Sequence, residues 1–268
     1  MDGERFGSFE QIKIIVRYEL LRHLRRRRLY AVLFITALIG MLPLIVLKGL
    51  NVGFPEVKQW TSTYYGYISL IVIVSGAFFA GDAIASEFEQ KTGYMLFPNP
   101  VKRTSLVIGK FIAAFLPVLL AVGFYYAIGV ISMWATYGTI PTATATSFAY
   151  AVLFSCSVLG LTFLFSALLK GSMGATLLAF FTLFLILPII GFVLTFTGNE
   201  PWYLPTYASG IITYIFDPPA KRVEIIPTDG LKFYVFYPDF LISVIVMAVY
   251  FIVTLLLSML ITNRKEMA

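Results

Sequence analysis

The chain has 268 residues, of which 59% are hydrophobic and 13% are charged, and its formal net charge is +6. Soluble domains carry about a quarter charged residues. With a mean hydropathy of +0.86, the polar residues are too few to cover a globule with a surface that water can wet. This composition excludes an ordinary soluble domain and indicates an integral membrane protein.

Six apolar stretches are long enough to cross a bilayer. A helix needs about 20 apolar residues, because each residue adds about 1.5 Å to a path of roughly 30 Å through hydrocarbon. The stretches that qualify are 29–47, 66–85, 111–134, 148–169, 175–196 and 240–261. They predict an all-α integral membrane protein, in which a six-transmembrane-helix bundle forms a single domain over residues 1–268.

The basic residues predict which side of the membrane each connecting segment faces. If both termini lie in the cytoplasm, 15 of the 20 lysines and arginines fall on cytoplasmic segments, where membrane proteins carry an excess of these residues. Trp60, Trp134 and Trp202 then fall at outer ends of spans, at the depth where aromatic side chains gather. We therefore expect a multi-pass protein of the plasma membrane with cytoplasmic N- and C-termini.

Residues 1–28 are expected to form a cytoplasmic amphipathic segment. One helical stripe carries its apolar side chains, which are Phe9, Ile12, Val16, Leu20 and Leu24. This stripe predicts an interfacial helix that lies along the inner leaflet. The alternative is a basic signal that only fixes the topology. Because the arginine run 25–28 adjoins a span, it indicates contact with membrane lipids, and no nucleic acid is expected as a partner.

The cytoplasmic loop 86–105, between the second and third spans, carries the most information about function. It begins with acidic residues, continues with an apolar tip and ends with prolines and basic residues. Acids ahead of a short helix and a proline behind it suit the helix dipole and stop the helix. The apolar tip needs a cover, which is either the bilayer interface or a groove on a soluble partner.

From Ile84 to Gly109-Lys110 the sequence resembles the first cytoplasmic loop of type-2 ABC exporter permeases. The topology and the N-terminal segment resemble that family as well. The resemblance implies that this loop forms a short coupling helix on a separate ATPase subunit. It implies that the partners are ABC ATPase subunits and a second permease subunit, in a homodimer or a heterodimer. The residues that it assigns to ATPase coupling are Glu87, Glu89, Thr92, Gly93, Tyr94, Leu96, Phe97, Pro100 and Arg103.

The sequence supplies few groups for enzymatic or metal chemistry. A phosphate-binding loop ends in Gly-Lys-Ser/Thr, but Gly109-Lys110 is followed by Phe111. One histidine, His23, and one cysteine, Cys156, cannot form a His-x-x-x-His or Cys-x-x-Cys site. We expect His23 to be solvated or lipid-facing and Cys156 to be a packing residue. The chain is expected to be no enzyme and to hold no cofactor or metal, with ATP and Mg²⁺ bound by the partner ATPase.

The extracellular loop 197–239 is too long for a simple connection. Its apolar run 210–216 is too short to span, so it is interpreted either as a re-entrant or interfacial helix or as part of an extracellular cap. Asp82 is the one acid inside a nominal span, and we expect it to form a structural ion pair at the root of the loop 86–105. No substrate-binding residue can be assigned from the sequence.

Two functions follow from these observations. The preferred one is the permease subunit of an ABC exporter, which moves a lipid, an amphiphile or a drug-like molecule with ATP hydrolysed by a separate subunit. The alternative is an integral membrane enzyme or an ion-coupled carrier that acts without an ATPase. A carrier is expected to show charge within the membrane or internal repeats, and neither is visible in the sequence.

Single cysteines test the orientation. Lys58→Cys and Arg222→Cys are expected to react with an impermeant maleimide in intact cells, because both positions are predicted to be extracellular. Asn99→Cys is expected to react only after the cells are permeabilised. Reaction at Asn99 without reaction at Arg222 would invert the predicted topology.

Overall fold

The computed structural model describes residues 7–50, 53–90, 103–228 and 231–265. Within these ranges the chain is mostly helical, and six helices are long and apolar enough to cross a membrane. Each of them overlaps one of the six predicted stretches. The protein is therefore a multi-pass membrane protein, as the composition predicted.

The spans consist of one or more helices each. The first is α2 (Arg27–Gly49), the third α7 (Arg103–Tyr137), the fourth α8 (Ala143–Leu168) and the sixth α13 (Phe240–Arg264). The second span joins α3 (Val57–Tyr65), α4 (Ile68–Ala80) and α5 (Ala85–Glu89). The fifth joins α9 (Ser172–Phe181), the π-helix η1 (Thr182–Ile186) and α10 (Leu187–Phe196).

Two local signals explain where helices begin and bend. Asp239 caps α13, because its carboxylate accepts hydrogen bonds from the backbone amides of Leu241 and Ile242 at 2.9 and 3.1 Å. In the fifth span Pro188 lacks an amide hydrogen and crowds the preceding turn. The π-helix η1 ends at Ile186, two positions before this proline, and such bulges are a common cause of helix kinks.

The second, third and fourth spans form the centre of the bundle. Phe79, Tyr125 and Phe154, one from each of these spans, are almost completely buried. The first span packs against α7 and the sixth against α8, whereas α10 has no buried residue. The bundle therefore has apolar side chains on its outer surface as well as in its core. This is expected for a protein that is surrounded by lipid or by another membrane chain.

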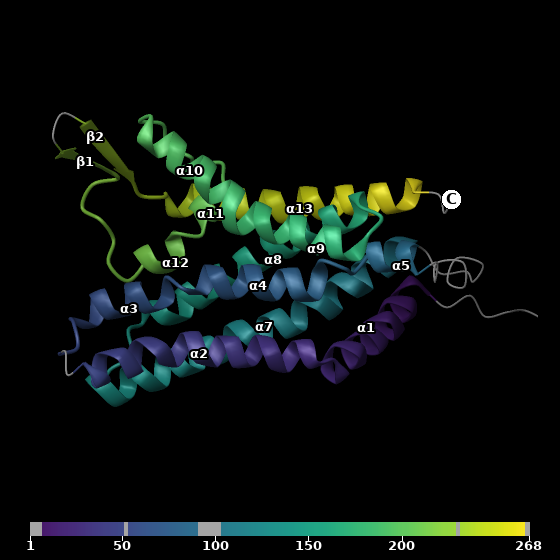
Figure 1. The fold of residues 1–268 in the computed structure, drawn as a ribbon, viewed down its shortest axis with the longest axis horizontal. Coiled ribbons are helices and arrows are strands. Elements are labelled where there is room, and N and C mark those ends of the chain that lie inside the picture. Colours follow the sequence, from purple (N-terminus) through teal and green to yellow (C-terminus); the bar gives the residue numbers. More distant parts are fainter. Residues whose placement is uncertain (1–6, 51–52, 91–102, 229–230, 266–268) are drawn as a thin grey trace, which may run out of the picture.

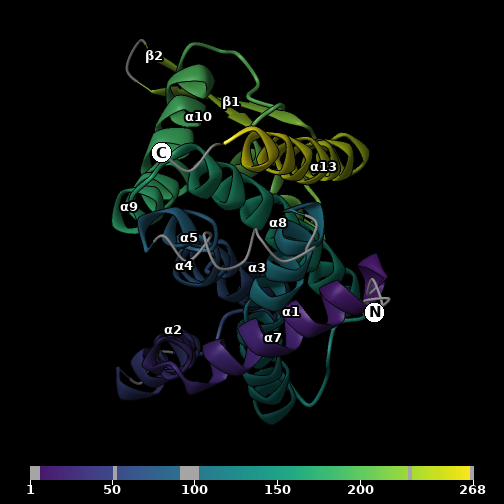
Figure 2. The same ribbon diagram turned by 90° about the vertical axis from the view of Figure 1, so that its right-hand side faces the viewer.

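The bundle has two unlike ends (Figure 1). One end holds α1 (Ser8–Arg25), α5, the start of α7 and the end of α13; we call it the charged end. The opposite end holds α3, α11 (Pro205–Ala208), α12 (Ile211–Tyr214), β1 (Val223–Thr228) and β2 (Leu231–Phe236); we call it the hairpin end. Helix α1 runs across the spans at the charged end (Figure 2).

The strands β1 and β2 correct the prediction of an all-α protein. They pair antiparallel, from Val223 opposite Phe236 to Thr228 opposite Leu231. Both segments are rich in β-branched and aromatic residues, which favour strands. The apolar run 210–216, for which two interpretations were open, contains the short helix α12. Its Ile211 and Ile212 are fully buried, so protein covers this helix.

The two ends of the predicted apolar stripe of α1 face away from the bundle, since Phe9 is 79% exposed and Leu24 is 44% exposed. The face that packs on the bundle contains Ile15, Glu19 and His23. The inward face of α1 is partly polar because its Glu19 pairs with Lys110 of α7, as described below. Whether its outward face contacts lipid stays a prediction.

A glycine on α7 permits the close approach of α1. A Cβ atom at Gly109 would lie 2.7 Å from Cγ2 of Ile15 on α1, whereas one at Gly123 of the same helix would meet no atom within 4 Å. Gly109→Ala is therefore expected to displace α1 and to lower the midpoint of thermal unfolding. Gly123→Ala, the matched control, is expected to leave it unchanged or to raise it, since alanine is the better helix former by about 0.5–1 kcal/mol. The opposite order of the two midpoints, measured on purified protein in detergent, would contradict this packing.

Candidate functional site

A buried lysine joins three elements at the charged end. The ammonium Nζ of Lys110, on α7, lies 2.6 Å from Oε1 of Glu19 on α1 and 2.7 Å from Oε1 of Glu87 on α5. The Lys110 side chain is 3% exposed. We call these three residues the Lys110 cluster. Its members are far apart in the sequence, so the cluster fixes how α1 and the end of the second span sit on the third span.

Lys110 favours the ionised form of the Glu19 carboxyl. Burial by itself would raise the pKa of Glu19, but the charge and hydrogen bond of Lys110 outweigh it, so this pKa falls below the ordinary value of 4.5. The pair therefore stabilises the fold above pH 4.5, and this contribution is lost as the pH falls through the lowered pKa of Glu19. Arg22, 3.5 Å from the other carboxylate oxygen of Glu19, adds a second positive charge.

Asp82 forms the expected ion pair at the same end. Its Oδ2 lies 2.7 Å from Nη1 of Arg28 and 3.7 Å from Nη1 of Arg26. Arg28 also donates a hydrogen bond of 3.3 Å to the carbonyl of Phe78. The arginine run at the start of the first span is thus tied to the second span, and the ion pair predicted for Asp82 is present.

His23 does not lie where the sequence suggested. The side chain was expected to be solvated or lipid-facing, but it is buried, and its ring meets the ring of Phe79 edge-on with centroids 5.4 Å apart. Burial lowers the pKa of His23 to about 4, so the imidazole is neutral near pH 7. It therefore packs beside Glu19 and Asp82 as an aromatic side chain, without adding to the positive charge of α1.

The two flanks of the loop 86–105 are held by other spans. On one flank the carboxylate of Glu89 accepts hydrogen bonds from the amide of Ser172 at 2.9 Å and from its hydroxyl, at the start of α9. On the other flank Arg103 donates to the carbonyls of Thr262, Asn263 and Lys265 at 2.9 to 3.2 Å. An acid at the start of one helix and a base at the end of another both complement helix dipoles.

A second basic residue closes this end. Nζ of Lys265 donates to the carbonyls of Ala167 and Leu169, at 2.9 and 2.8 Å, and lies 4.5 Å from the centroid of the Phe88 ring. These contacts join the ends of the second, fourth and sixth spans. Polar contacts at the two flanks of the loop therefore link the second span to the fifth and the third span to the sixth, and Lys265 adds the fourth span.

Three of the residues assigned to ATPase coupling lie within the described part of the chain. Glu87, Glu89 and Arg103 surround the root of the loop, each bound to a different element. The remaining six lie outside the described residues; they are Thr92, Gly93, Tyr94, Leu96, Phe97 and Pro100. Sequence reasoning missed Glu19 and treated Lys110 as a topology signal. A lysine followed at once by the apolar run 111–122 could have indicated a buried charge.

Glu87 and Glu89 lie within α5, at the end of the second span. The short coupling helix itself was expected beyond them, outside the described residues. Among the residues that the structure describes, no group of three or more histidine, cysteine or acidic side chains could hold a metal ion.

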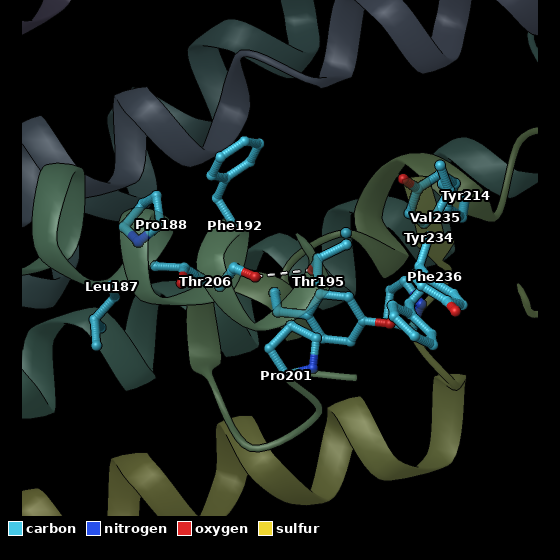
Figure 3. Close-up of a pocket in the computed structure, with 14 residues that line it drawn as sticks. Leu187, Pro188, Phe192, Thr195, Pro201, Thr206, Tyr214, Tyr234, Val235 and Phe236 are labelled. Carbon is cyan, nitrogen blue, oxygen red and sulfur yellow. Dashed lines mark hydrogen bonds between the residues drawn. The ribbon is translucent and has the colours of Figure 1, made fainter. Parts of the chain in front are cut away.

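The hairpin end carries a pocket of a different character, with a volume of about 390 Å³. We call it the aromatic pocket (Figure 3). Pro188 and Phe192 line one side of it, and Tyr214, Tyr234 and Phe236 line the other. Its size falls within the range of about 300–1,000 Å³ typical of small-molecule sites. It is thus a candidate binding site, distant from the Lys110 cluster.

Lys110→Met tests the cluster. The variant leaves the carboxylates of Glu19 and Glu87 buried without the ammonium group between them. Removing one partner of a buried ion pair costs about 3–5 kcal/mol, so the free energy of unfolding in mixed micelles, titrated with sodium dodecyl sulfate, is expected to fall by that amount. Adding Glu19→Gln and Glu87→Gln is expected to restore most of the loss. Lys58→Met is the control, because Lys58 is exposed; an equal effect of both methionine variants would refute the role of the cluster.

A comparison with known protein families gives a match that covers most of the chain. No curated protein matches it. A family model matches residues 48–268, a range that includes Glu87 and Lys110 and begins after Glu19. Because this match covers well over half of the chain, the chain belongs to the family described as "Protein of unknown function (DUF2705)".

Proposed function

We propose that this protein is the permease subunit of an ATP-binding cassette exporter. It moves a lipid, an amphiphile or a drug-like molecule across the plasma membrane, and a separate subunit hydrolyses the ATP. The observation that carries this proposal is the Lys110 cluster, in which one buried ammonium joins α1, α5 and α7 at the root of the loop 86–105. This geometry complements the resemblance of the loop to the coupling loop of type-2 ABC exporters.

The contacts at the loop flanks suit the transmission of force. A load applied to the loop acts on the second span through Glu87 and on the fifth through Glu89. It acts on the sixth span through Arg103 and on α1 through Lys110. Because a packed interior transmits strain and resists compression, a push by an ATPase at this loop would tilt several spans together.

The exposed faces of the bundle support an assembly of two permease subunits. The first span is apolar and mostly exposed along α2, and α10 of the fifth span has no buried residue. Soluble proteins do not expose surfaces of this kind, so lipid or a second copy of the chain, identical or related, covers them. Two permeases and two ATPases would give the twofold symmetry that is common in oligomers.

The alternative function is an integral membrane enzyme or an ion-coupled carrier that works without an ATPase. A carrier needs an ionisable group that gains and loses its ion near the middle of the membrane. Asp82 and Lys110 lie at the charged end, each in contact with an opposite charge, which disfavours this role. Transport by the purified chain alone in vesicles, driven by an ion gradient, would favour the carrier.

Leu96→Asp together with Phe97→Asp tests the coupling loop. If the apolar tip of the loop seats in a pocket on the ATPase, two buried anchors are lost. Anchors of this kind commonly contribute 2 kcal/mol or more each, which corresponds to roughly thirtyfold in affinity. The ATPase is then expected to be lost when the permease is purified from membranes, while the membrane level of the permease is unchanged.

The matched control is Trp202→Asp with Tyr203→Asp, which places two acids on exposed aromatic residues at the hairpin end. The ATPase is expected to remain bound to this variant. Glu87→Ala is unsuitable as a control, because Glu87 belongs to the Lys110 cluster. Full retention of the ATPase by the loop variant would refute the coupling role and favour a tip that dips into the bilayer.

A further inference from the structure

Two pockets at the hairpin end meet at a single tyrosine. Tyr214 of α12 lines the aromatic pocket and also a second pocket with a volume of about 570 Å³. We call the second one the acidic pocket; its residues include Ser62, Thr63, Asp217, Glu224 and Tyr237. The ring of Tyr214 meets that of Tyr237 edge-on, with centroids 5.0 Å apart. A molecule that spans both pockets would therefore pass this tyrosine.

The aromatic pocket suits an apolar group. Rings and prolines form most of its wall, and two of its hydroxyl groups are already engaged. Thr195 donates to the carbonyl of Gly191 at 2.8 Å, and Tyr207 donates to the carboxylate of Glu200 at 3.1 Å. With these groups satisfied, the wall favours a hydrocarbon chain or ring.

The acidic pocket suits a cation. Asp217 and Glu224 supply two exposed carboxylates, and Glu224 accepts a hydrogen bond of 3.3 Å from Tyr237. No lysine or arginine is among the residues that line it in the described part of the chain. Arg222, which is two residues before Glu224, pairs with acids outside this pocket. Its guanidinium lies 3.1 Å from Glu200 and 3.7 Å from Asp239.

A bare metal ion fits this pocket poorly. Divalent cations with oxygen ligands use several convergent oxygens at about 2.0–2.6 Å, and the described residues contain no group of three or more candidate ligands. An organic cation requires less, since it is bound by carboxylates at longer range and by aromatic faces within about 6 Å. Tyr214 and Tyr237 line the pocket together with the two acids.

We propose that the hairpin end binds a cationic amphiphile, with the apolar part in the aromatic pocket and the cationic group in the acidic pocket beside Tyr214. As a binding site this stands on the two pockets alone. Its assignment as the site of the transported molecule rests on the proposed function. It narrows the substrate class to cations, since neutral lipids and anionic amphiphiles lack the charge that Asp217 and Glu224 attract.

The test uses two probes with the same chain, radiolabelled dodecyltrimethylammonium and the uncharged dodecyldimethylphosphine oxide. Binding is measured on the purified chain in nanodiscs of phosphatidylcholine, with empty discs subtracted. The cation is expected to bind at least tenfold more tightly than the neutral probe. Asp217→Asn with Glu224→Gln is expected to weaken binding of the cation about tenfold, without effect on the neutral probe.

Two further variants separate the site from general surface charge and from folding. Glu56→Gln removes an exposed acid at the hairpin end that does not line either pocket, and it is expected to leave both affinities unchanged. Tyr214→Leu keeps an apolar side chain. It is expected to weaken binding of the cation about threefold more than binding of the neutral probe. Equal binding of the two probes, no effect of the double variant, or an equal effect of Glu56→Gln would each overturn the proposal.

The outcome is separable from that of the coupling experiment, because this assay contains no ATPase. Binding of the cation by a chain that never co-purifies with an ATPase would retain the site and refute the exporter. Loss of the ATPase from the loop variant, with no binding of either probe, would retain the exporter and refute the site.

Discussion

The structure at the charged end depends on the burial of one ammonium group. A lysine that is 3% exposed must be matched by opposite charge, because the desolvation of an unpaired ion costs several kcal/mol. Neither matching acid is near Lys110 in sequence, so the fold must bring α1 and α5 to it. This requirement explains why α1 lies across the spans and why a polar face of that helix, with Glu19 and His23, points inward.

The two ends of the bundle are stabilised by different interactions. At the charged end, ion pairs and bonds to helix-terminal carbonyls connect the spans, as with Arg103 on the last carbonyls near α13. At the hairpin end, stacked rings connect the elements in addition to the ion pairs of Arg222: Tyr65 lies between Tyr126, at 4.4 Å between centroids, and Phe216, at 5.2 Å. Charged groups are selective for their partners, whereas aromatic rings mainly contribute buried surface area. The charged end therefore determines which spans are joined, and the hairpin end determines how closely its elements pack.

The spans could be predicted from the sequence because hydrocarbon imposes a minimum length on every apolar helix. The ion pair of Asp82 could be predicted because a carboxylate within a nominal span is costly unless an opposite charge or water lies beside it. The Lys110 cluster could not, since its pairs join residues 91 and 23 positions apart and charge at a membrane boundary is also explained by topology. The hairpin was missed although Asp229-Gly230 lies between two strand-forming segments, a common turn signal, because the surrounding composition favoured helices.

The fifth span connects the two candidate sites. Its start is fixed at the charged end by the bonds between Ser172 and Glu89, next to the root of the loop. Beyond η1 and Pro188 the helix α10 diverges from the bundle (Figure 1) and supplies one wall of the aromatic pocket. A π-helix before a proline weakens the hydrogen-bond ladder at one level of a span, so the two halves of this span can change their angle there. A displacement of the loop root would thus be transmitted along the fifth span toward the wall of the aromatic pocket.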